Sequence, residues 1–313
     1  MYRELLRQGF RRKTSSTEYL LRVIDELSKS IHDRGGFIKK YIEVSRKVLE
    51  ERPTNAGSIN VLRKIGLKLL SSDFDSVKEL LDKAREDAGR ACQEAARIAT
   101  HRVSDGDTLM TMSDGICLRS FFKFLADSRT RFSVYVLESR PGMEGVSLAE
   151  YLESLGVETY LVVDSAARFF MKNINKVFIG VEAIAVNGAI IGKVGTSVLA
   201  LAANEARVRV FAIAPIYKFS FETIYGELLR LPEGDWRLLM DEETKNKLPS
   251  DYRARVPLFD VTPPNLVDGV ITEHGLFAPQ AIPLVLRQVY GEFPIYAEPL
   301  QEIVHQVEKK YGR

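Results

Sequence analysis

The chain has 313 residues, of which 45% are hydrophobic and 27% charged, and its formal net charge is +2. This composition is typical of a globular protein with one large or two medium domains. No apolar run approaches the roughly 20 residues needed to cross a membrane, so we expect no membrane contact.

The cysteine and histidine content argues against metal chemistry. Cys92 and Cys117 are too few for a disulfide framework or a metal cluster, and the four histidines show no ligand spacing. We therefore expect no metal and no cofactor. No apolar segment of signal-peptide length follows the basic N-terminus, which favours a cytoplasmic location.

Charge is distributed unevenly along the chain. Residues 1–104 carry 22 Lys and Arg against 15 Asp and Glu, whereas the remainder carries 22 against 27. Such asymmetry is compatible with a nucleic-acid or acidic-protein partner, but a solvated helical surface is its more common cause. No nucleic-acid-binding motif accompanies it.

The first hundred residues have the period of amphipathic helices. Apolar residues recur at helical spacing in segments 17–32, 39–51 and 72–102. Asp73 is a plausible N-cap for the third segment. We therefore predict an all-helical N-terminal domain over residues 1–105.

From residue 107 the pattern changes to short β-branched and aromatic runs that alternate with helical segments. The expected strands are 108–112, 132–137, 157–163, 176–180 and 208–213, and the expected helices lie near 116–127, 145–155, 165–172 and 192–206. This alternation predicts a doubly wound α/β domain with a parallel sheet and right-handed crossovers over residues 106–313. A charged stretch, 233–256, reads as an inserted loop.

A glycine-rich turn is the most informative local motif. An apolar run ends at Gly180 and Glu182, and Gly188 and Gly192 then lead towards a helix. Glycines allow close backbone approach, the first amides of a helix are unpaired, and Lys193 adds a positive charge, so we expect a phosphate at this turn. The turn is not a Walker loop, because the glycine spacing and the residue after the lysine differ.

Polar residues follow several of the expected strands. Ser113, Arg140, Asp164 and Glu182 all come just after a strand end. Ligands of doubly wound sheets bind beyond the carboxyl ends of the strands. We therefore expect these side chains to converge on one cleft.

Taken together, these motifs resemble those of a known superfamily. The shared stretches, in the same order, are Arg34-Gly35, Arg52-Pro53-Thr54, Glu138 to Gly145, Asp164-Ser165-Ala166, Asn187 to Thr196, Tyr217-Lys218-Phe219 and Phe259 to Pro264. The superfamily comprises the alpha, beta and delta subunits of initiation factor 2B, archaeal ribose-1,5-bisphosphate isomerase and methylthioribose-1-phosphate isomerase. The resemblance implies a helical domain followed by a Rossmann-like domain, a homodimer or hexamer, and a site for a sugar phosphate or nucleoside monophosphate at their junction.

The resemblance also implies which residues bind the ligand. Arg34, beside Gly35, and Arg52 match arginines that hold phosphate in the isomerases, and a guanidinium suits this role because its fork binds phosphate oxygens bidentately. Lys193 matches a phosphate-binding lysine. The remaining members of the expected ligand set are Ser113, Arg140, Glu182, Gly192 and Lys218.

The catalytic positions differ from the isomerase pattern. The isomerases have cysteine, aspartate and asparagine where this chain has Ser113, Glu182 and Gly192. A serine hydroxyl ionises far less readily than a thiol, whose pKa is about 8.5, and glutamate is about 1.5 Å longer than aspartate. Cys117, one helical turn after Ser113, is expected to be a buried packing residue.

These differences favour a non-catalytic regulatory protein that binds a phosphorylated small molecule and has no catalytic residues. Its implied protein partner is a subunit of translation initiation factor 2. The alternative is an aldose–ketose isomerase that acts on ribose-1,5-bisphosphate or a similar sugar 1-phosphate.

Overall fold

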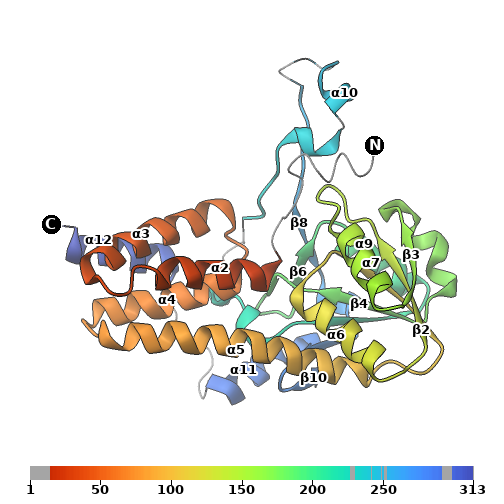
Figure 1. Cartoon of the computed structure of the whole chain (residues 1–313), viewed down its shortest axis with the longest axis horizontal. Coiled ribbons are helices and arrows are strands. Elements are labelled where there is room, and N and C mark those ends of the chain that lie inside the picture. The colour runs from red at the N-terminus through yellow and green to blue at the C-terminus, as the bar shows by residue number, and fades with distance from the viewer. Residues whose placement is uncertain are drawn as a thin grey trace.

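The structure is a computed structural model that describes residues 15–225, 230–240, 242–247, 249, 252–290 and 298–312. Long helices lie side by side at one end of the molecule, and a sheet covered by helices forms the other end (Figure 1). Among the described residues, no helix has the length and apolar character needed to cross a membrane.

The N-terminal helices follow the predicted periodicity. They are α2 (Ser16–Ser28), α3 (Arg34–Glu51), α4 (Ala56–Leu70) and α5 (Asp75–Thr100). Ser15 and Glu18 form a capping box at the start of α2, and the side chain of Asn55 caps α4 through the Ser58 amide. The predicted cap Asp73 lies two residues before α5, where its carboxylate accepts from the amide and hydroxyl of Ser76.

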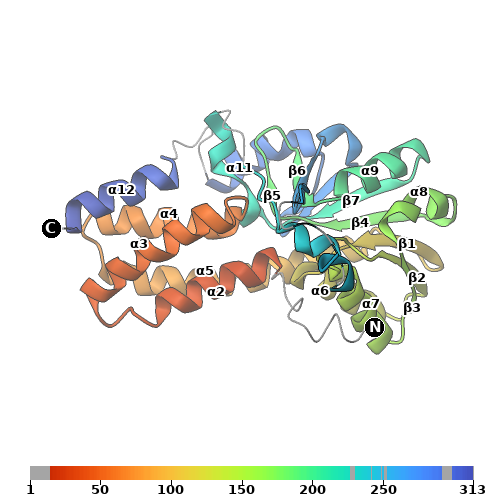
Figure 2. The same cartoon turned by 90° about the horizontal axis from the view of Figure 1, so that it is seen from above.

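The C-terminal helix returns to the helical end of the molecule. Helix α12 (Leu300–Tyr311) packs against α3 and α4 (Figure 2), and Leu300, Ile303 and Val307 are fully buried in the same apolar cluster as Leu27 and Leu62. The predicted helical domain, residues 1–105, therefore lacks one of its helices, because α12 also belongs to it. The amphipathic pattern of α12 places its apolar face on the first domain, although the chain reaches it last.

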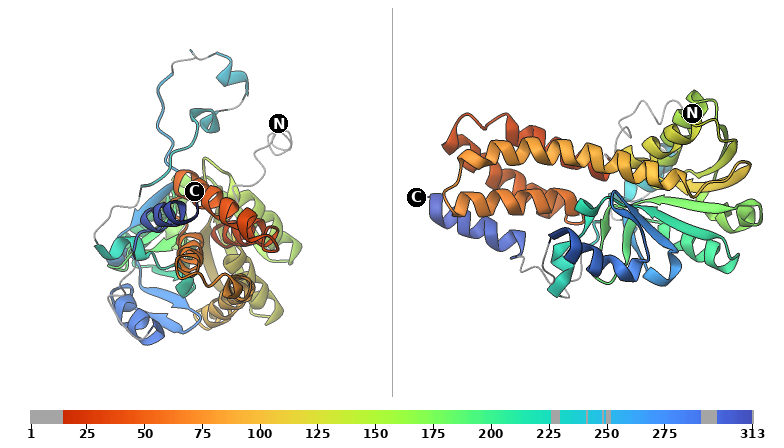
Figure 3. Two further views of the ribbon diagram at one scale, coloured as in Figure 1. Left: turned by 90° about the vertical axis from the view of Figure 1, so that its left-hand side faces the viewer. Right: turned by 90° about the horizontal axis from the view of Figure 1, so that it is seen from below.

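Helix α5 belongs to both ends of the molecule. Its second half packs against α6 (Ile116–Asp127), and Cys92 and Ala96 share an apolar cluster with Phe121. Figure 3 shows this helix running from the helical end along the sheet domain. Small side chains on this face of α5 allow the close approach.

The main sheet has seven strands in the order β10-β9-β7-β4-β1-β2-β3. Their bounds are β1 (Asp107–Met112), β2 (Phe132–Leu137), β3 (Glu158–Val162), β4 (Lys176–Gly180), β7 (Arg209–Ile213), β9 (Gly269–Thr272) and β10 (Gly275–Phe277). All pairings are parallel except that of β10 with β9. A buried helix face covers each side of the sheet, as the doubly wound prediction requires.

Successive strand residues point to opposite faces of this sheet. On β1, Leu109 packs in the cluster that contains α6 and α7 (Glu144–Ser154), whereas Met110 packs in the cluster that contains α8 (Ala167–Phe170), α9 (Thr196–Glu205) and α11 (Ile282–Tyr290). Two-sided burial explains why the central strands read as continuous apolar runs.

A second, antiparallel sheet lies beside the first and was not predicted. It contains β5 (Ala183–Ile184), β6 (Ile190–Lys193) and β8 (Phe259–Thr262). The helix expected over 192–206 therefore begins only at Thr196, because Gly192 and Lys193 pair with Asp260 and Phe259 as a strand. The stretch before β8 projects from the body and carries the short helix α10 (Glu242–Lys245) (Figure 1).

Candidate functional site

A cleft lies where the helical end meets the sheet, beyond the carboxyl ends of β1 and β4. The space between its walls, including the solvent-filled mouth, is about 440 Å³. The start of α2, the end of α3, the loop after β1 and the segment after β4 all contribute to its walls. The lining residues that carry polar side chains are Ser15, Ser16, Thr17, Arg52, Ser113, Asp114, Glu182, Lys193 and Lys218.

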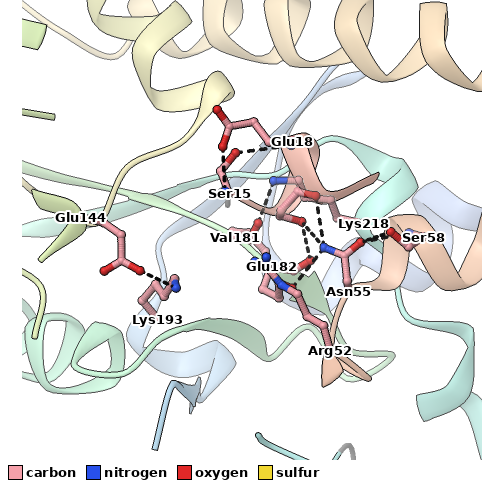
Figure 4. A network of polar contacts seen from close by, with 11 residues as sticks. Ser15, Glu18, Arg52, Asn55, Ser58, Glu144, Val181, Glu182, Lys193 and Lys218 are labelled. Atoms are coloured by element: carbon pink, nitrogen blue, oxygen red, sulfur yellow. Dashed lines mark hydrogen bonds and ion pairs between the residues drawn. The ribbon is translucent and has the colours of Figure 1, made fainter. Parts of the chain in front are cut away.

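A buried ion pair connects the two ends of the molecule inside this cleft. Arg52, which follows α3, donates from Nε and Nη2 to the two carboxylate oxygens of Glu182 at 2.7 and 2.8 Å. Asn55 adds a third hydrogen bond to Oε1 of Glu182 at 3.1 Å (Figure 4). Glu182 is 4% exposed and Arg52 is 9% exposed, so the pair is largely removed from water.

This environment keeps Glu182 ionised. Burial acts to raise the pKa of the carboxyl group, but the charge and hydrogen bonds of Arg52, together with Asn55 and Lys193, outweigh it and hold the pKa below its ordinary value. The guanidinium lies against the rings of Tyr19 and Phe259, at 5.0 and 5.5 Å from their centroids. The fork that was expected to hold phosphate holds this carboxylate in the structure.

Lys218 is the second buried cation of the cleft. It ends the 3₁₀ turn Ile216–Lys218, is 4% exposed, and donates from Nζ to the Val181 carbonyl at 2.7 Å. Burial lowers the pKa of Lys218 to about 8; the Glu182 carboxylate opposes this shift and the Arg52 guanidinium adds to it. The amine is therefore present in both protonation states near neutral pH.

Lys193 forms the opposite side of the cleft. Its Nζ donates to Glu144 Oε1 at 2.6 Å and lies 5.0 Å from the centre of the Phe259 ring. Figure 4 shows this pair to one side of the group formed by Arg52, Asn55 and Glu182. Arg52 and Lys193 thus lie on two sides of the cleft, and each is held by a carboxylate.

Two amides of the glycine-rich turn already have an anionic partner within the protein. The carboxylate oxygen Oδ2 of Asp260 accepts from the amides of Gly195 and Ser197 at 2.8 and 3.1 Å, and from the Ser197 hydroxyl at 2.7 Å. The anion at the start of α9 is therefore a side chain of the protein itself. The motif over residues 180–196 could not predict this contact, because Asp260 lies on β8, more than sixty residues later in the chain.

Ser113 lies in the cleft, but no residue in the described part of the chain activates it. Its backbone adopts φ 65°, and its amide donates to the Ser139 hydroxyl at 2.6 Å. No described side chain hydrogen-bonds its own hydroxyl, so the residue has no base that would assist its ionisation. Cys117 also lines the cleft, and it is bonded to Cys92 in a disulfide that the sequence did not predict.

Several residues expected at the site lie elsewhere. Arg34 opens α3, where its guanidinium lies against the rings of Phe74 and Tyr311, and Gly35 donates its amide to the cap Asp33. Helix α3 has 18 residues. At about 1.5 Å of rise per residue, this helix separates Arg34 from Arg52 by roughly 27 Å.

Arg140 and Gly192 are also absent from the lining of the cleft. Arg140 Nη2 donates to the Leu239 carbonyl at 2.7 Å, which ties the loop after β2 to the projecting segment. Gly192 lies within β6, where a Cβ atom would come within 2.6 Å of the Thr196 hydroxyl. An asparagine at this position would require Thr196 to move.

The sequence reasoning missed the residues that take the place of Arg34 and Gly35. The start of α2, Ser15 to Thr17, lines the cleft, and the Ser16 hydroxyl donates to the Glu182 carbonyl at 3.3 Å. The capping box formed by Ser15 and Glu18 was visible in the sequence as a serine followed three residues later by glutamate. It locates a helix N-terminus, and such ends often face ligands.

Comparison with known proteins identifies the family. The model of the Initiation factor 2 subunit family matches residues 12–279, which include every residue of the cleft. The chain belongs to this family. Ribose 1,5-bisphosphate isomerase from Thermococcus kodakarensis is 33% identical over 92% of this chain and 92% of its own length. The isomerase of the same name from Methanocaldococcus jannaschii is 34% identical over 82% of each.

Solved structures agree with the predicted fold class. The translation initiation factor eIF-2B of Pyrococcus horikoshii OT3 superposes with a TM-score of 0.61 at 27% identity, over 82% of this chain and 97% of that chain. The 5-methylthioribose 1-phosphate isomerase of the same organism reaches a TM-score of 0.69 at 20% identity, over 88% and 84% respectively. The predicted superfamily and its fold are thereby confirmed.

The prediction of a non-catalytic regulatory protein is wrong by the same comparison. Six relatives that are 28–34% identical over most of this chain are named ribose 1,5-bisphosphate isomerase. The changes at Ser113, Glu182 and Gly192 were taken as the loss of an active site. The geometry explains two of these changes without loss of activity. Glu182 remains a buried ionised carboxylate, and a side chain at Gly192 would collide with Thr196.

Proposed function

We propose that this protein is an aldose–ketose isomerase of a phosphorylated pentose, with ribose 1,5-bisphosphate as the substrate class. The observation that carries the proposal is the cleft in which ionised Glu182 lies beside Arg52 and Lys218, with Lys193 opposite. The family relatives named as such isomerases support it.

The reaction suits a site built from acids and bases alone. As the ring of a sugar 1-phosphate opens, the ring oxygen gains a proton and its bond to C1 breaks. C2 and its hydroxyl each lose a proton, C1 gains one, and a carbonyl forms at C2. C1 is reduced while C2 is oxidised, so the electrons balance within the substrate. Lys193 and Arg52 would attract the phosphate groups, and the cleft would hold the reacting carbons near Glu182 and Lys218.

Turnover is the direct test. Incubation with ribose 1,5-bisphosphate, followed by phosphorus NMR, is expected to show conversion to the ketose bisphosphate. Glu182→Gln removes the negative charge while it keeps the shape, and it should lower the rate by about 10²–10⁴-fold, the usual range for an acid or base residue. Lys123→Ala breaks an exposed ion pair with Asp127 and serves as the control that should leave the rate unchanged. Binding without conversion by the wild-type protein would contradict the proposal.

Ligand binding should be visible as thermal stabilisation. A ligand that binds only the folded protein raises its melting temperature, so ribose 1,5-bisphosphate should do so in proportion to its concentration. Lys193→Ala is expected to remove most of this shift, because it deletes a cation whose side chain is 15% exposed in the cleft. Differential scanning fluorimetry with Lys172→Ala as a matched control tests this, and an equal shift in both variants would place the phosphate site elsewhere.

We also infer that the chain assembles as a dimer, with the exposed apolar face of α9 in the contact. Ile271 and Leu286 pack into the protein's own core, whereas Leu284 of α11 is 68% exposed. Val198 and Leu201 of α9, three positions apart on one helix, are 61% and 58% exposed. Light scattering at micromolar concentration should give the mass of a dimer, and Val198→Glu with Leu201→Glu should shift it towards the monomer. A monomeric wild-type protein would refute this expectation.

A further inference from the structure

Among the charged side chains that line the cleft, Lys218 differs in its partner. Arg52 is paired with Glu182 and Lys193 with Glu144. Asp114 accepts from Arg119 Nε at 2.7 Å. The hydrogen bond of Lys218 goes instead to a neutral acceptor, the backbone carbonyl of Val181.

We propose that Lys218 is the proton-transfer residue of this cleft and takes the role that the unactivated Ser113 cannot fill. The inference rests on the proposed function, since it assigns a step of the same isomerisation. Neutral Lys218 would take the proton from C2 of the substrate, and the resulting ammonium group, whose protons exchange with solvent, would donate a proton to C1. The proton lost by the C2 hydroxyl balances the one gained by the ring oxygen. No other oxidant, reductant or co-reactant is needed for the transfer.

The geometry favours this role over a purely structural one. Lys218 Nζ needs one N–H for the Val181 carbonyl, and a neutral amine keeps that hydrogen bond while its lone pair remains available to the cleft. The amine is attached to a short 3₁₀ turn that is itself anchored, because Asn60 donates to the carbonyls of Tyr217 and Phe219 at 3.1 and 2.8 Å. The base is therefore held by packed backbone on both sides.

The surrounding charges keep the amine close to its titration point. Burial favours the neutral amine and lowers the pKa of Lys218. The Glu182 carboxylate opposes this effect and the Arg52 guanidinium adds to it, so that the resulting pKa is about 8. A general base is most effective when its pKa lies near the working pH. Since the neutral amine is the active form, kcat/KM should rise with pH through this value.

Two substitutions test the assignment against simple loss of structure. Lys218→Met removes the amine, and Lys218→Arg keeps a positive charge that cannot be shed near neutral pH. Both are expected to lower kcat by at least about 10²-fold, with KM changed by only a few fold and the phosphate-dependent rise in melting temperature retained. In deuterated water, the wild-type product should carry deuterium at C1.

Rescue separates a chemical role from a positional one. Added primary amines should restore part of the activity of Lys218→Ala, and the restored rate should increase with the basicity of the amine. An active wild-type protein with a Lys218→Met variant of nearly equal kcat would overturn the assignment alone. A wild-type protein that binds but never converts the sugar bisphosphate would overturn the proposed function, and the assignment with it.

Discussion

Replacing Arg52 by alanine is expected to lower the free energy of unfolding by about 3–5 kcal/mol, because it leaves a buried charge without its partner. Glu182 is 4% exposed and would lose both hydrogen bonds from the guanidinium, while the one from Asn55 would remain. Urea denaturation followed by circular dichroism measures the change. A loss below about 1 kcal/mol would mean that water reaches the carboxylate and that the pair is not buried in solution.

Two controls make this measurement specific to burial. Arg85→Ala breaks the ion pair with Asp25, whose side chain is 49% exposed, and should cost at most about 1 kcal/mol. The double variant Arg52→Met with Glu182→Gln removes both charges and should recover much of the stability, since the remaining groups need no counter-charge. That variant should nevertheless be inactive, which would show that the pair is retained for the site rather than for the fold.

The same pair predicts a dependence of stability on pH. The pKa of Glu182 is lower in the folded protein than in the unfolded chain, where it is about 4.3. The stabilisation is therefore fully present above this unfolded value and is lost as the pH falls through the folded pKa. Arg52→Ala should weaken this contribution to acid sensitivity, because it removes the main cause of the lowered pKa.

The fold was predictable because its signals are local. The amphipathic period of α2, α3 and α5 and the apolar runs of β1, β2 and β4 each depend on residues within one element. The right-handed crossovers of a doubly wound sheet then leave few topologies. The antiparallel sheet of β5, β6 and β8 escaped prediction, since β5 has only two residues and the pairing of β6 with β8 joins residues more than sixty positions apart.

The site was predictable only in part, because some of its contacts join residues that are distant in the sequence. Five predicted residues do converge, because each ends or closely follows an element whose end faces the cleft: Arg52, Ser113, Glu182, Lys193 and Lys218. Motif order alone misplaced Arg34, which occupies the far end of α3. The amides before α9 were assigned to a phosphate because a sequence cannot show that Asp260 already occupies them.

Gly145→Ala is expected to be the most damaging of the small substitutions near the cleft. A Cβ atom at this position would lie 1.8 Å from the backbone oxygen of Leu137, so the start of α7 would have to move away from the end of β2. Forced overpacking that shifts the backbone typically costs about 1–3 kcal/mol, and we expect this substitution to lie at the upper end. The movement would also carry Glu144 away from Lys193, now 2.6 Å distant, so the variant should lose both stability and the phosphate-dependent rise in melting temperature.

Gly89→Ala provides the matched comparison, because the same methyl group meets no atom within 4 Å on α5. There the intrinsic preference of alanine for helix should raise the free energy of unfolding by about 0.5–1 kcal/mol, with ligand binding unchanged. Opposite signs for one substitution at two glycines would show that the contact with Leu137, and not the amino acid type, requires glycine at position 145. Equal effects at both positions would refute the close approach of α7 to β2, and with it the placement of Glu144 at the cleft.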